Sequence, residues 1–211
     1  MARRVVCISR LAGAGGEAVG RTVADTLGYR LVDEEILQQA AESSGVSVEE
    51  LADAEHRTKV IDGLLRNFAI AGGAAGLMSP GASVAIDVGA VSDPKSLRAL
   101  IQQSIHETAE RGDVVIVSHA ASHALADNAG VLRVLVTASA ETRATRVAQE
   151  ASLDDKKAAK LVADSDAHRA QYLRRFYGVS EERPTHYDLA LNSDSLSIEL
   201  MSDLIVRAAA P

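Results

Sequence analysis

The chain has 211 residues, of which 47% are hydrophobic and 24% are charged, and its formal net charge is −7. This length and composition are typical of one globular domain that buries a core without disulfides or metal ions. The net negative charge argues against nucleic acid or an anionic membrane as a partner. No apolar run reaches the roughly 18 residues of a transmembrane helix, so no membrane span is expected.

The single cysteine, Cys7, lies within an apolar run. One cysteine excludes an internal disulfide and is typical of a protein from a reducing compartment. Arg10 interrupts the apolar run, which is too short for a secretory signal. We therefore expect a cytoplasmic protein in which Cys7 is a small buried core residue.

The N-terminal part begins with a strand, a glycine-rich loop and a helix. Val5–Ile8 is rich in β-branched residues, which predicts a strand buried on both faces. After the glycine-rich loop, the apolar spacing predicts a helix that ends at Gly28. Residues 29–32 predict a second strand, and Asp33 then forms a candidate N-cap for a helix over 34–42.

The middle of the chain is harder to assign. Residues 47–78 predict two helices, the second rich in apolar residues, and residues 79–92 match no element. Asp93 followed by Pro94 is an N-cap with proline at the first helical position, which predicts a helix to about Arg111.

The last part of the chain alternates strands with helices. A capping-box pattern at residues 152–155 predicts the start of a long charged helix towards Tyr177, and residues 197–209 predict a final amphipathic helix. The remaining strands are predicted at residues 114–117, 131–136 and 187–192. Five short apolar strands separated by helices predict an α/β fold with a mostly parallel sheet covered on both faces.

The glycine-rich segment carries the candidate nucleotide site. From Gly15 it matches the P-loop pattern G-x-x-x-x-G-[basic]-T, with arginine where lysine is usual. Glycines let successive N–H groups surround a phosphate, and the following helix adds the positive end of its dipole. We expect ATP with Mg²⁺, Arg21 bridging the outer phosphates and the Thr22 hydroxyl holding the metal. The expected cofactor-binding residues are Gly13, Gly15, Gly16, Gly20, Arg21 and Thr22.

Other interpretations of this segment remain open. A glycine-rich turn without a ligand would have the same composition. A dinucleotide-binding loop would need glycine where the sequence has Ala18, although Asp33 and Glu34 stand at a ribose-binding distance along the chain. Arg21 is planar and bulkier than lysine, which favours binding over turnover.

Several blocks together resemble the cytidylate kinase-like family of P-loop kinases. The resemblance implies a P-loop kinase fold in one domain over residues 1–211, with a helical lid over about 140–177 and an acceptor-side insertion over about 45–92. It covers nearly the whole chain except residues 55–92. The matching blocks are Ile8 to Gly16, Leu27 to Leu37 and Glu110 to Val117. Further matches are Arg143 and Arg146 with Asp166 to Arg169 and Tyr172, and Tyr187 to Leu189 with Asn192 and Leu196 to Glu199.

The resemblance implies phosphoryl transfer from ATP to a nucleoside monophosphate such as CMP, or to a related small acceptor. Arg143 and Arg146 would stabilise the transferring phosphoryl group as catalytic residues, together with Arg21. Arg143 and Arg146 are spaced i, i+3, as are Asp166 and Arg169. Residues that form ordinary salt bridges on solvated helices would show the same spacing. The implied substrate-binding residues are Asp33, His119, Asp166 and Arg169.

Departures from the family pattern leave the activity and the acceptor open. His119 stands where the family often carries an arginine, and its charge depends on pH. With Arg21, this leaves a catalytically weak nucleotide-binding regulatory protein as the alternative function. His119 and His123 have no third ligand nearby in the sequence, so no zinc site is expected. The expected partner is a small-molecule nucleotide, and a homodimer through the apolar residues 60–78 remains open.

Overall fold

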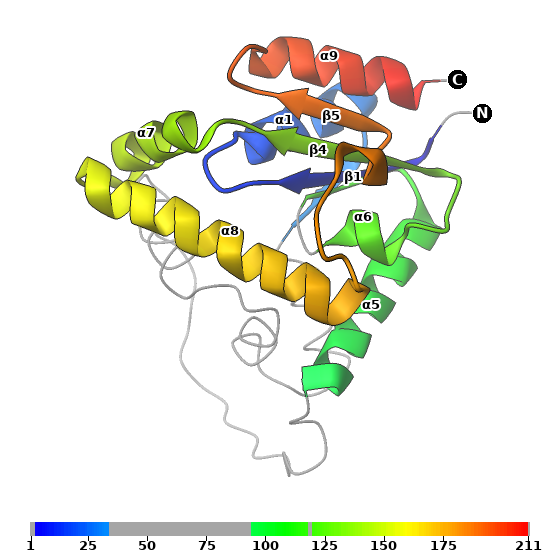
Figure 1. Ribbon diagram of the computed structural model, residues 1–211. Coiled ribbons are helices and arrows are strands. Elements are labelled where there is room, and N and C mark those ends of the chain that lie inside the picture. The colour runs from blue at the N-terminus through cyan, green and yellow to red at the C-terminus, as the bar shows by residue number, and fades with distance from the viewer. Residues whose placement is uncertain (1–2, 34–93, 118–119, 211) are drawn as a thin grey trace, which may run out of the picture.

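The computed structural model describes residues 3–33, 94–117 and 120–210 (Figure 1). Several predicted features lie outside the described residues. They are the helices expected within 34–78, the possible dimer interface 60–78, the acceptor-side insertion over about 45–92, the N-cap Asp93 and the proposed substrate residue His119.

Five strands form one sheet in the order β2-β3-β1-β4-β5, and each pair in it is parallel. The predicted sheet is therefore confirmed. From the central strand β1 the chain builds two strands on one side and then two on the other. The carboxyl end of β1 is thus a switch point, where open parallel sheets bind ligands. The strands are β1 Val5–Arg10, β2 Arg30–Val32, β3 Val114–Val117, β4 Val131–Thr137 and β5 Leu189–Asn192.

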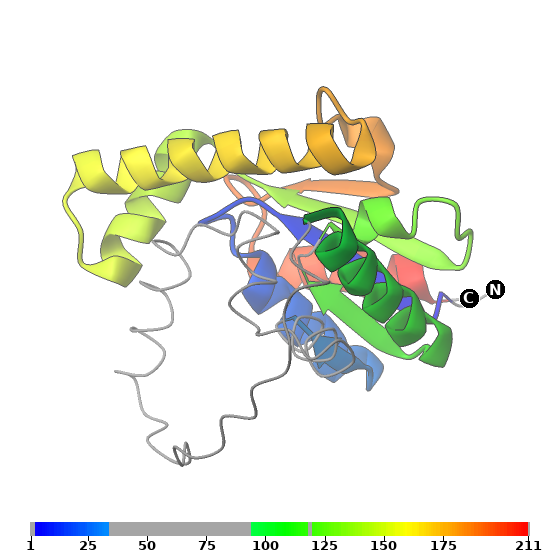
Figure 2. The same cartoon turned by 90° about the horizontal axis from the view of Figure 1, so that it is seen from below.

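Helices cover both faces of the sheet (Figures 1 and 2). On one side α1 (Gly16–Leu27) packs beside α9 (Ile198–Ala209), and on the other α5 (Pro94–Arg111) packs with the short α6 (Ala121–Ala124). No helix in the described ranges is long and apolar enough to cross a membrane.

Alternation along the strands explains the two layers. In β1, Val6 and Ile8 join the core beneath α1 and α9, whereas Val5 and Cys7 join the core beneath α5. Cys7 is fully buried, as predicted, and burial raises its pKa to about 12. The thiol is therefore a core group rather than a reactive one.

The predicted lid is a helical hairpin of α7 (Ala140–Ala151) and α8 (Asp155–Tyr177). Ser152, expected to open the capping box of α8, instead ends α7 in the left-handed conformation. The N-cap of α8 is Asp154, whose side chain accepts a hydrogen bond from the Lys157 N–H at 2.9 Å. The two helices share a small apolar seam of Val147, Ala148, Ala158 and Val162.

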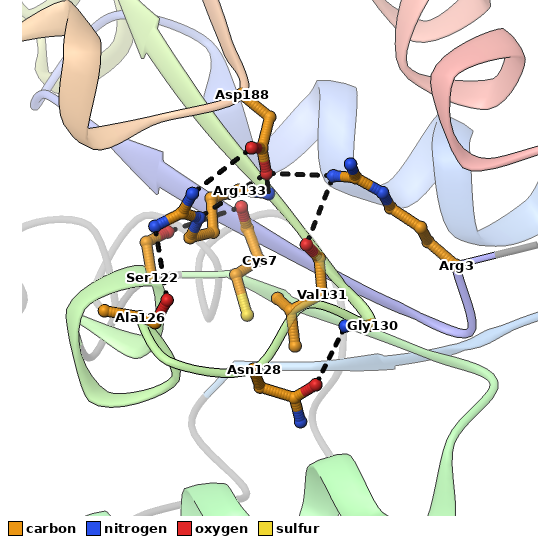
Figure 3. A network of polar contacts seen from close by, with 9 residues as sticks. All are labelled: Arg3, Cys7, Ser122, Ala126, Asn128, Gly130, Val131, Arg133 and Asp188. Atoms are coloured by element: carbon orange, nitrogen blue, oxygen red, sulfur yellow. Dashed lines mark hydrogen bonds and ion pairs between the residues drawn. The ribbon is translucent and has the colours of Figure 1, made fainter.

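A polar network fixes the amino-terminal edge of the sheet (Figure 3). Arg3 Nη1 donates to Asp188 Oδ2 at 3.0 Å and to the Val131 carbonyl at 3.2 Å. The backbone N–H of Arg133 donates to the same carboxylate at 2.8 Å. The pKa of Asp188 lies below its usual value. Partial burial acts to raise it, but the hydrogen bonds from Arg133 and the positive charge of Arg3 together have the larger effect. The network joins the starts of β1 and β4 to the residue before β5.

Candidate functional site

The loop between β1 and α1 lies at the carboxyl end of the central strand. Gly13 and Gly15 have φ values of 77° and 82°, in the left-handed region that favours glycine. Gly16 begins α1, and a Cβ added there would lie 2.5 Å from the Cβ of Arg10. The backbone path therefore requires these glycines, as the sequence pattern indicated.

Three successive carbonyl groups of the loop, those of residues 12–14, accept hydrogen bonds from other elements. Since a trans peptide directs its N–H opposite to its carbonyl, the amides of these peptides point away from the anchoring side chains. The first N–H groups of α1 also have no partner within the helix. The Ala14 N–H donates to the Leu11 carbonyl at 3.0 Å, so the donors presented to a ligand are the N–H groups of Gly13 and Gly15 and those that open α1. The anchoring donors are Arg143 Nη1 at 3.4 Å, Arg146 Nη1 at 3.3 Å and Ser193 Oγ at 2.9 Å.

A pocket of about 140 Å³ lies against this loop. The loop and the first turn of α1 form one wall, from Arg10 to Ala18, and the α7–α8 hairpin forms the other. The positive end of the α1 dipole and the loop amides make this pocket suited to a phosphate. The hairpin residues that line it are Val147, Glu150, Ala151 and Leu161.

The structure does not bring Arg21 and Thr22 to the loop. They lie five and six residues after the first residue of α1, which at 1.5 Å per residue is about 7–9 Å along the helix. Arg21 is exposed, and the Thr22 hydroxyl donates to the Ala18 carbonyl at 3.0 Å. Gly20 is a packing residue, because a Cβ there would lie 2.5 Å from Cγ2 of Val117. These two residues thus lie at least one helical turn beyond the start of α1, whereas a P-loop places its basic residue where the helix opens.

Arg143 and Asp166 are brought together, although the resemblance gave them different roles. Arg143 is only 3% exposed and makes a two-pronged ion pair with Asp166, Nη1 to Oδ1 at 2.9 Å and Nη2 to Oδ2 at 2.7 Å. Its Nε donates to the Ala138 carbonyl at 3.1 Å. This arginine therefore joins the start of α7, the glycine loop and α8.

Arg146 lies one turn further along α7 and binds the segment after β5. Its Nη1 donates to Ser193 Oγ and its Nη2 to the Ser193 carbonyl, both at 2.8 Å. Because Ser193 also anchors the loop carbonyl of Ala14, Arg146 and Ser193 form one connected support for the loop.

Arg169 belongs to a separate buried cluster. It makes a two-pronged pair with Glu182, Nε to Oε2 at 2.8 Å and Nη2 to Oε1 at 2.6 Å. The Tyr187 hydroxyl donates to Glu182 and lies 3.2 Å from Nε2 of His123. Burial raises the pKa of Glu182, but hydrogen bonds from Arg169 and His123 outweigh this and hold it well below its usual range. Burial also raises the pKa of Tyr187 to about 12.

The remaining predicted substrate residue, Asp33, directly follows β2 at the carboxyl edge of the sheet. This is the edge that also carries the glycine loop, because the strands are parallel. β3 separates β2 from β1, so Asp33 and the loop are two strand positions apart along that edge.

The model of the Cytidylate kinase-like family matches residues 5–195. The chain belongs to the cytidylate kinase-like family. The resemblance drawn from the sequence blocks is therefore confirmed over most of the chain, and the fold is that of a P-loop kinase.

Cytidylate kinases of archaea are similar to this family member at low identity. The enzyme of Archaeoglobus fulgidus is 25% identical over 208 residues, which cover 96% of this chain and 93% of that protein. The enzyme of Methanoculleus marisnigri is 26% identical over 121 residues, covering 57% of this chain and 66% of that protein.

Solved structures share the fold of this family member. An uncharacterised protein from Eubacterium ventriosum has a TM-score of 0.65 at 16% identity, with 97% of each chain covered. Shikimate kinase from Bacteroides thetaiotaomicron has a TM-score of 0.51 at 14% identity, also with 97% of each chain covered. At these identities the likeness shows the fold alone.

Sequence reasoning missed two residues of this family member's loop region. Ser193 belongs to no recognisable sequence motif. Its role depends on a contact with the loop, which is far from it in the sequence. Arg10 was part of a matching sequence block, but only the path of its side chain over Gly16 shows that it lines the pocket. The described residues contain no group of three metal-ligating side chains.

Proposed function

We propose that the protein is an ATP-dependent kinase that transfers a phosphoryl group to a nucleoside monophosphate such as CMP, or to a related small acceptor. The observation that carries this proposal is the anchored glycine loop facing a pocket, in a chain of the cytidylate kinase-like family. The loop amides and the N-terminus of α1 would bind the outer phosphates of ATP. This is the electrostatic part of phosphoryl transfer, which depends mainly on positioning and charge neutralisation.

When bound, Mg²⁺ would supply positive charge that neutralises the phosphate oxygens. Mg²⁺ typically uses one or two carboxylates in addition to phosphates and water. Glu150 is a carboxylate that lines the pocket and fits this donor set, whereas Glu17, which also lines the pocket, is paired with Arg10. Thr22 does not fit, because its hydroxyl bonds within α1.

The α7–α8 hairpin would exclude water from the transferring group, as kinase lids do. Arg143 and Arg146 are held by Asp166, Ser193 and the loop carbonyls. To contact the transferring phosphoryl group, they must exchange some of these bonds for phosphate oxygens.

The acceptor would lie along the carboxyl edge between the loop and Asp33. Arg169 pairs with Glu182 through Nε and Nη2, so it would bind an acceptor phosphate through its Nη1 side or after leaving Glu182. In this arrangement Arg169 positions Glu182 and still has N–H donors for a phosphate.

The decisive assay measures ADP formation from Mg·ATP with a panel of nucleoside monophosphates and other small acceptors. We expect turnover that depends on the acceptor and is greatest with a cytidine monophosphate. A matched control is Gly15→Val, which places a β-branched residue at a φ of 82° and should abolish turnover while the remaining fold persists. An absence of acceptor-dependent ADP throughout the panel would contradict the kinase proposal.

A second candidate is a nucleotide-binding regulatory protein of the same fold. It is favoured by the occupied arginines and by the lack of a lysine in the loop. Such a protein would be stabilised by Mg·ATP but would not form ADP with any acceptor. Thermal unfolding with and without Mg·ATP, measured beside the assay, separates the two functions.

A further inference from the structure

Arg10, the last residue of β1, crosses the N-terminus of α1. Its side chain packs directly over Gly16: a Cβ added to Gly16 would lie 2.5 Å from Cβ and 3.2 Å from Cδ of Arg10. Gly16 therefore leaves the space that the arginine stem fills. The arginine also lines the pocket against the glycine loop.

The guanidinium of Arg10 has unused donor capacity. The side chain is 19% exposed, and its Nη2 forms an ion pair with the carboxylate of Glu17, in the first turn of α1. Its Nε is buried and makes no hydrogen bond within the described part of the chain. A buried charged N–H without an acceptor is unfavourable, so a shift of the side chain that brings this N–H to an anion in the pocket would relieve it.

The other candidate cations are placed differently. Arg21 is exposed further along α1, and Arg143 and Arg146 are bound to Asp166 and Ser193. Of the described residues that line the pocket, Arg10 alone is basic. The loop has no lysine, and the positive charge beside the pocket is therefore that of Arg10, at the end of the preceding strand.

We propose that Arg10 supplies the phosphate-contacting charge of this site, and that Glu17 occupies Arg10 until the phosphate displaces it. This inference rests on the proposed function, since the ligand is the polyphosphate of a nucleotide. A guanidinium can bind a phosphate with two parallel hydrogen bonds. The Glu17 carboxylate holds the same guanidinium and sits in the first turn of α1, where negative charge is also stabilised. Phosphate and Glu17 thus compete for one position.

Calorimetric titration with inorganic pyrophosphate, without Mg²⁺, tests the two residues separately. Arg10→Met keeps an apolar stem over Gly16 and should weaken binding at least about tenfold, or about 1.4 kcal/mol. Glu17→Gln removes the competing charge and should tighten binding several-fold. Arg10→Lys should retain part of the affinity. Arg207→Met, on the exposed last turn of α9, is the matched control and should bind as the parent does.

The outcomes distinguish this inference from the proposed function. If the parent binds neither pyrophosphate nor Mg·ATP, the proposed function fails. If the parent binds and Arg10→Met binds equally well, the Arg10 assignment is overturned. The same holds if Arg21→Met, rather than Arg10→Met, loses affinity. Circular dichroism checks the fold of each variant. Should Arg10→Met not fold, unchanged affinity in Glu17→Gln still overturns the competition.

Discussion

At the scale of single residues, the part-buried charge of Glu182 has defined partners. Glu182 is held by Arg169 at 2.6 and 2.8 Å and also contacts Tyr187, whereas its neighbour Glu181 pairs with Arg183 at the surface. Two glutamates adjacent in sequence thus have opposite environments. Comparing variants of the two glutamates therefore isolates the contribution of the Arg169–Glu182 pair to stability.

Glu182→Gln should lower the free energy of unfolding at pH 7 by roughly 1.5–3 kcal/mol, because it removes charge-assisted hydrogen bonds to Arg169. The folded pKa of Glu182 is lowered, so its contribution is present above its unfolded pKa of about 4.3 and is lost as pH falls towards the folded pKa. Urea unfolding at pH 7 and pH 3.5 should show a difference between parent and variant that shrinks at the lower pH. The control Glu181→Gln should change stability by less than about 1 kcal/mol at both.

Gly20 offers a test of the loop's true position. Gly20→Ala should destabilise the fold by roughly 1–3 kcal/mol through overpacking, because its Cβ would lie 2.5 Å from Val117 Cγ2. Pyrophosphate affinity should remain that of the parent, since Gly20 is not part of the loop. Adding Val117→Ala should recover part of the stability. A large loss of affinity in the folded Gly20→Ala variant would return Gly20 to the phosphate site.

At the scale of elements, α7 supports the loop from behind. Its arginines bind the carbonyls of residues 12 and 13, and the residue after β5 binds the next carbonyl. The loop is therefore held in shape by elements that follow it by more than a hundred residues. This arrangement preorganises the amides before a ligand arrives.

Arg146→Ala separates a supporting role from a chemical one. As a support, Arg146 should contribute roughly 1.5–3 kcal/mol to stability, and its loss should weaken pyrophosphate binding several-fold. As a stabiliser of the transition state alone, it would leave folding intact and lower phosphoryl transfer at least about tenfold. Unfolding, binding and turnover measured on this variant decide between them. Arg174→Ala, exposed on α8, is the control and should change none of the three.

The sequence indicated most elements but not their junctions. Apolar runs and helix caps predicted the five described strands and helices α1, α5, α8 and α9, and the family resemblance implied that α7 belongs to a helical lid. The four-residue α6 was missed, because it is too short for a periodic pattern. Ser152 and Asp154 both resemble N-caps, and only the backbone distinguishes the end of one helix from the start of the next.

The site was less predictable than the fold for a related physical reason. A P-loop pattern specifies residue types but not where the helix begins, so Gly20 and Arg21 matched letters that belong to the helix interior. The contacts of Arg10 and Ser193 depend on side-chain paths and on segments distant in sequence. Such contacts leave no local periodic signal.

At the scale of the whole molecule, the two edges of the sheet have different roles. The amino edge is closed by the network around Asp188, which joins β1, β4 and the entry to β5. The carboxyl edge carries the loop, the pocket and the hairpin. A bound ligand should therefore contact the carboxyl edge and leave the contacts at the amino edge unchanged.

Binding of Mg·ATP should stabilise the whole fold, and it should slow the amide exchange that occurs by local opening only near the pocket. At 100 times the dissociation constant the stabilisation is about 2.7 kcal/mol, which for a domain of this size raises the melting temperature by about 5–10 °C. Because the hairpin forms one wall of the pocket, hydrogen exchange should slow in residues 10–18 and 140–177. It should stay constant around Arg3, Arg133 and Asp188. The reverse pattern, protection at the amino edge without protection of the hairpin, would place the nucleotide elsewhere and remove the hairpin from the role of a lid.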